Sequence, residues 1–96
     1  MHIEAERGTV LLKLGRRFTV QDADRLRQAV ESLVPFSQLT VDFTEVRELH
    51  DAAFLSLSKT LAALVDVKVV LRGLTIHQVR VLRYLGMPSA EVRARV

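Results

Sequence analysis

Residues 39–64 read LTVDFTEVRELHDAAFLSLSKTLAAL, and this stretch decides the fold. It opens with an alternation in which Leu39, Val41 and Phe43 point to one side, as in a strand with one face against a core. It closes with apolar residues spaced three and four apart, the period of one helix face. These are Phe54, Leu57, Leu61 and Leu64, followed by Val65 just beyond the stretch.

The junction between these two patterns is residues 48–51, which read ELHD. Asp51 is the only side chain there that strongly favours a helix start. The sequence therefore predicts a strand, a short loop and a helix capped by Asp51.

Composition indicates one ordinary globular domain covering residues 1–96, with 49% hydrophobic and 26% charged residues. The absence of cysteine excludes disulfides, a thiolate nucleophile and a Cys-based zinc site. The first ten residues lack a signal-peptide pattern, and no apolar run approaches the ~20 residues that span a bilayer. We therefore expect a cytoplasmic protein without membrane insertion. Because the chain begins with Met1, we also expect a stand-alone domain.

The net charge of +3 and the pI near 10.0 raise the alternative of a nucleic-acid-binding module. However, the eleven arginines are scattered, and between Asp22 and Glu31 they alternate with acidic residues. That pattern is typical of a solvated helix face rather than of a phosphate-binding stripe. The charge distribution therefore argues against a nucleic-acid partner.

Two strands are predicted at residues 2–6 and 9–14, joined by a turn in which Gly8 takes a positive φ. A helix follows, begun by Thr19 and stopped by Pro35. The β-branched run at 67–71 predicts a mostly buried strand, which Arg72-Gly73-Leu74 breaks after Leu71.

Thr75 and Gln78 form a capping-box pattern that opens a last helix. Gly86 and Pro88 would stop that helix, and residues 89–96 alternate like a short edge strand. Strands that alternate with helices predict an α/β domain with a mixed four- to five-stranded sheet and helices mainly on one face. Functional loops of such sheets follow the carboxyl ends of strands, which directs attention to residues 44–51.

The segment Val41-Asp42-Phe43-Thr44-Glu45-Val46 resembles the strand pattern of the STAS domain family, the fold of bacterial anti-sigma factor antagonists. Residues 69–74, 78–79 and 82–87 are similar to the family's last strand and helix. The resemblance covers most of the chain and implies a non-catalytic protein-interaction module in a partner switch or scaffold.

The family's Asp-Ser-Ser/Thr-Gly phosphorylation motif is degenerate in this chain. His50 stands at the Asp, Asp51 at the phosphorylatable serine, Ala52 at the second hydroxyl residue and Ala53 at the glycine. The resemblance therefore implies that phosphorylation at the usual serine is not available. Asp51 has two interpretations: a helix cap, or a fixed negative charge that also mimics phosphoserine.

The resemblance implies as partner either an anti-sigma factor that is a serine kinase of the histidine-kinase-like ATPase type, or another STAS protein. Self-association as a homodimer stays open. The nearest alternative is a small STAS subunit that binds the ATPase of a membrane lipid transporter. The expected partner-binding residues lie in the loop and on the outward face of the central helix, where small residues and an exposed leucine permit close approach. They are Glu48, His50, Asp51, Ala52, Leu55, Ser56, Lys59 and Ala63.

Enzymatic chemistry has no recognisable motif in this chain. A Gly-rich phosphate loop, a nucleophile elbow and paired catalytic carboxylates are all missing from the sequence. His50 has no second ligand at metal-binding spacing, since His2 and His77 are distant in sequence. We therefore expect no catalytic residue, no cofactor and no metal.

Overall fold

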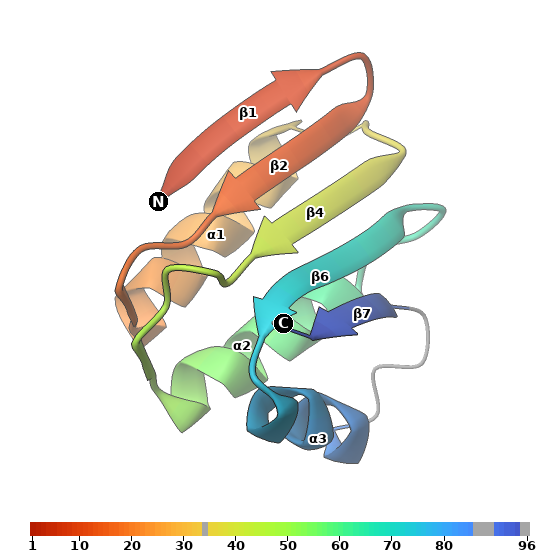
Figure 1. Cartoon of the computed structure of the whole chain (residues 1–96). Helices are drawn as coiled ribbons and strands as arrows, with labels where there is room; N and C mark the ends of the chain where they lie inside the picture. The colour runs from red at the N-terminus through yellow and green to blue at the C-terminus, as the bar shows by residue number, and fades with distance from the viewer. Residues whose placement is uncertain (34, 86–89, 95–96) are drawn as a thin grey trace.

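The computed structural model describes residues 1–33, 35–85 and 90–94. Five strands form one mixed sheet in the order β1-β2-β4-β6-β7 (Figure 1). Only the first pair is antiparallel, and all other neighbours run parallel. The strands are β1 (His2–Glu6), β2 (Thr9–Lys13), β4 (Gln38–Asp42), β6 (Lys68–Leu74) and β7 (Ala90–Ala94).

Three helices connect the parallel strands and lie on the same side of the sheet (Figure 1). They are α1 (Val20–Leu33), α2 (Asp51–Ala62) and α3 (Ile76–Tyr84). The predicted α/β class, with a mixed sheet and helices on one face, is confirmed. The edge strand predicted within residues 89–96 is also present as β7.

The first hairpin turns as its sequence requires. Arg7 and Gly8 both have positive φ, at 51° and 80°. Two successive positive φ values give the type of two-residue turn whose twist matches that of the flanking strands. The turn also supports β4, because the Gly8 carbonyl accepts from the backbone N–H of Ser37 at 2.7 Å.

Two helices begin with reciprocal caps. The Thr75 hydroxyl accepts from the Gln78 backbone N–H, and the Gln78 side chain accepts from the Thr75 backbone N–H, as the capping-box pattern predicts. At the start of α1, Thr19 and Asp22 make the same exchange. The predicted stop of α3 at Gly86 and Pro88 lies outside the described residues.

The predicted break of the 67–71 strand at Arg72-Gly73-Leu74 is wrong, because β6 runs through these residues to Leu74. Gly73 has a φ of 77°, and the pairing register with β7 shifts between Arg72 and Leu74. In a sequence, a glycine at a β-bulge cannot be distinguished from a glycine that ends a strand.

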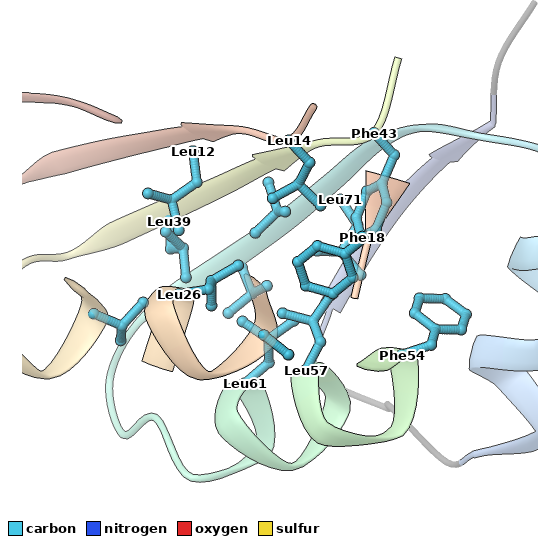
Figure 2. Close-up of a cluster of buried hydrophobic side chains, with 14 of the residues drawn as sticks. Leu12, Leu14, Phe18, Leu26, Leu39, Phe43, Phe54, Leu57, Leu61 and Leu71 are labelled. Atoms are coloured by element: carbon cyan, nitrogen blue, oxygen red, sulfur yellow. The ribbon is translucent and has the colours of Figure 1, made fainter. Parts of the chain in front are cut away.

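One core fills the space between the sheet and the helices (Figure 2). Alternate residues of β2, β4 and β6 point toward the helices, which present their own apolar faces in return. The largest side chains with almost no exposure are Phe18, Phe43, Leu12, Leu26, Leu39, Leu57, Leu71, Leu74 and Leu82.

Candidate functional site

A second, two-stranded sheet positions the start of α2. Strand β3 (Arg17–Phe18) runs parallel to β5 (Glu48–Leu49), pairing Arg17 with Glu48 and Phe18 with Leu49. The backbone N–H of His50 then donates to the Phe18 carbonyl at 3.2 Å. The segment expected to be a simple loop is therefore held by backbone pairing to residues 31 and 32 positions earlier.

Three aromatic rings hold the same region from inside. Phe43 makes edge-on contacts with Phe18, at a centroid distance of 6.4 Å, and with Phe54, at 6.1 Å. Figure 2 shows the three rings between the sheet and the first turn of α2. Edge-to-face geometry adds to the stability that burial of the rings already provides. The packing of these rings thus holds the start of α2 in place against the sheet.

Asp51 does not cap α2, contrary to the prediction. His50 occupies the N-cap position with extended backbone angles, φ −76° and ψ 133°, and no side chain accepts a cap hydrogen bond there. Asp51 is the first helical residue and is exposed. Its carboxylate favours the helix through the positive end of the helix dipole rather than through a capping bond.

The predicted partner-binding residues lie along one accessible stripe of α2 and the loop before it. Glu48, His50, Asp51, Ala52, Leu55, Lys59 and Ala63 are exposed, whereas Ser56 is half-buried and Ala63 follows the last helical residue. Leu55 keeps 43% of its surface accessible. Ala53, a motif position outside the predicted partner-binding set, is fully buried. We call the exposed residues Ala52, Leu55, Lys59 and Ala63, with Ser56, the α2 face.

The far half of the α2 face opens into a groove against α1. This groove measures about 520 Å³ and is lined on the α2 side by Ser56, Lys59 and Ala63. Helix α1 contributes Arg27, Val30 and Glu31. The predicted residues therefore include two groups. Glu48, His50, Asp51 and Ala52 lie at the start of α2, which we call the head of α2, and Ser56, Lys59 and Ala63 line the groove.

Asp42 organises the carboxyl end of β4. Its carboxylate accepts from the Thr44 hydroxyl, from the Thr44 backbone N–H at 2.9 Å and from Arg72 Nε at 3.2 Å. Burial raises the pKa of Asp42, but the bonds from Thr44 and the Arg72 guanidinium outweigh it, so the pKa lies below its usual value. The role of Asp42 is to fix the turn that leads toward the candidate site.

Sequence reasoning missed a cluster of arginines beside the head of α2. Arg16, Arg17, Arg47 and Glu48 line a surface hollow of about 400 Å³, which we call the arginine hollow. The Arg16 carbonyl accepts from the backbone N–H groups of Arg47, at 2.7 Å, and Glu48, at 2.9 Å. These contacts join two segments 31 positions apart in the β3–β5 pairing, so only the folded chain brings the arginines together.

Two features bear on other functions. Within residues 1–33, 35–85 and 90–94, no helix combines the length and the apolar composition needed to cross a membrane. The described part of the chain also lacks any group of three or more His, Cys, Asp or Glu side chains placed to share a metal ion.

No protein-family model matches the sequence, and no curated protein matches it. Among solved structures, the chain is similar to a chain of the stressosome, described as a signal integration and transduction hub. The TM-score is 0.59 at 15% sequence identity, and the match covers 99% of this chain and 89% of that chain. At that identity, the similarity shows a shared fold: this chain has the α/β architecture of a stressosome chain.

Proposed function

We propose that this protein is a non-catalytic protein-interaction module of the STAS type, acting in a signalling or scaffolding assembly. The observation that carries the proposal is the α2 face, which presents an exposed leucine among small residues on a helix anchored by three aromatic rings. A rigid helix with such a face suits close approach by a partner helix. The shared fold with a stressosome chain supports the same class.

The proposed partner is a histidine-kinase-like ATPase of the anti-sigma type or another STAS protein. Residue 51 is an aspartate, which offers no hydroxyl for a serine kinase. We propose that its fixed charge holds the head of α2 in one binding state, as a partial copy of phosphoserine. A phosphate carries ~1.5 to 2 negative charges, so the copy is incomplete.

The test is an affinity pulldown from the native cell at low and high salt, using wild type, Leu55→Ala and Asp51→Ser. Val65→Ala is the matched control, because Val65 is also exposed and apolar but lies beyond α2. We expect the wild type and the Val65 variant to retain an ATPase of this type or a STAS protein at both salt concentrations. Leu55→Ala should lose it. Asp51→Ser should change the amount retained, because it removes the fixed charge.

Three outcomes would contradict the proposal. Equal retention by Leu55→Ala would remove the α2 face from the interface. Unchanged retention by Asp51→Ser would remove the phosphoserine-like role of that carboxylate. Recovery of nothing except salt-sensitive nucleic acid would favour the nucleic-acid alternative instead, because phosphate contacts weaken steeply with salt.

A further inference from the structure

We infer that the arginine hollow binds a carboxylate-rich segment of the protein partner. The inference rests on the proposed function only in taking the partner to be a protein. The first observation is charge: three guanidinium groups and one carboxylate give the lining a formal charge of +2. All four side chains are exposed, so this charge faces solvent.

The second observation is the contrast with the paired arginines of α1 and β6. Arg25 and Arg27 pair with acidic residues of their own helix, and Arg72 pairs with Asp42. Within the described ranges, the side chains of Arg16 and Arg47 form no ion pair. The charges of Arg25, Arg27 and Arg72 are therefore locally balanced, whereas those of Arg16 and Arg47 are not.

The third observation is geometry. Arg17 Nε donates to a Glu48 carboxylate oxygen at 3.0 Å, which holds this guanidinium beside Glu48 in the lining. A guanidinium has five N–H donors in a planar fork, so Arg17 retains donors, and Arg16 and Arg47 offer complete forks. Paired N–H donors match the two oxygens of a carboxylate, and such charge-assisted pairs are the stronger class of hydrogen bond.

The fourth observation is position. Strand β5 ends at Leu49 and α2 starts at Asp51, so the hollow borders the head of α2. A partner that binds the first turn of α2 would lie next to this hollow. Charge complementarity there would direct encounter and orientation more than it would raise affinity.

A peptide fits the arginine hollow better than a nucleic acid does. Glu48 lies in the lining, and the exposed carboxylate of Asp51 lies two residues beyond β5. These two carboxylates reduce the positive charge of this surface, which a nucleic acid needs along its whole phosphate backbone. Three clustered arginines are also fewer than the extended basic stripe typical of nucleic-acid-binding proteins.

The experiment is a titration of the full ¹⁵N-labelled chain with a hexaglutamate peptide, followed by NMR, with a hexaglutamine peptide in parallel. We expect saturable shifts centred on Arg16, Arg17 and Arg47 with hexaglutamate only. The double variant Arg16→Gln/Arg47→Gln should bind about tenfold more weakly, since each exposed charge contributes modestly. Glu48→Gln should bind about threefold more tightly, because it removes the negative charge from the lining.

The matched control is Arg80→Gln/Arg83→Gln, which removes the same charge from two exposed residues of α3. Its affinity should stay within twofold of wild type. Equal weakening in both double variants, or no saturable shift in the wild type, would overturn the inference. Tighter binding of single-stranded oligothymidine through the same arginines would also overturn it, in favour of nucleic acid. The pulldown tests the proposed function separately, so either can fail alone.

Discussion

At the scale of single residues, Gly73 carries the sharpest constraint. A Cβ atom at this position would lie 2.6 Å from the backbone nitrogen of Thr44, and the φ of 77° is unfavourable for any other residue. Thr44 is also the residue that hydrogen-bonds Asp42. The turn after β4 and the bulge in β6 therefore fit against each other.

We expect Gly73→Ala to lower the free energy of unfolding by ~2 kcal/mol or more, since backbone strain and a clash with backbone atoms act together. Gly15→Ala is the control: a Cβ there meets nothing within 4 Å, and the change should stay below about 1 kcal/mol. Urea unfolding of both variants measures the difference. Equal stability of the two would mean that Thr44 moves aside without cost.

Asp51 and Thr75 make a second contrast between residues. Thr75→Ala removes a hydrogen-bonded cap and should cost ~1 kcal/mol at any salt concentration. Asp51→Ala removes only an exposed charge near the helix dipole and should cost ~0.5 kcal/mol, a loss that salt screens. Thermal unfolding at low and high salt separates the two. A salt-independent loss at Asp51 would show that its side chain caps α2 after all.

At the scale of elements, α2 combines a buried face that fixes it and an exposed face left for a partner. Phe54 is 3% exposed and contacts Phe43, whereas its neighbour Leu55 is 43% exposed. We expect Phe54→Ala to lower the free energy of unfolding by ~3 to 5 kcal/mol. Leu55→Ala should change it by less than ~0.5 kcal/mol.

Chemical denaturation measures both changes. Phe54→Leu, expected to cost ~1 kcal/mol, covers the case in which the alanine variant does not fold. A large loss at Leu55 would mean that this leucine belongs to the core. The interface assigned to the α2 face would then lose its main apolar contact.

The elements also show what a sequence can predict. The apolar periods of β2, β4, α1 and α2 were readable because each is long enough to repeat. Strands β3 and β5 have two residues each, too short to show any period. The arginine hollow was not predicted for a related reason: Arg16 and Arg47 come together only through that pairing. The α2 face was predicted as a set, while the N-cap was misplaced by one residue onto Asp51.

At the scale of the whole molecule, two carboxylates make the stability of the fold depend on pH. The backbone N–H of Thr19 holds the pKa of Asp22 below its usual value, against the opposing effect of burial. Asp42 is shifted in the same direction by Thr44 and Arg72, which together outweigh its burial. Asp22 caps the start of α1, whereas Asp42 fixes the turn at the end of β4. The two carboxylates therefore stabilise different parts of the fold.

A carboxylate with a lowered folded-state pKa favours the folded chain above its unfolded pKa, near 3.8 for both groups. That contribution disappears as the pH falls through the lowered folded-state value. We therefore expect these two groups to leave the thermal midpoint unchanged between about pH 7 and pH 5. Below about pH 4, their protonation should lower the midpoint. Asp22→Asn/Asp42→Asn should be less stable at pH 7 and should show a shallower drop. An unchanged acid slope in the double variant would mean that other groups cause the acid sensitivity. The hydrogen bonds of Asp22 and Asp42 would then contribute nothing to the pH dependence of stability.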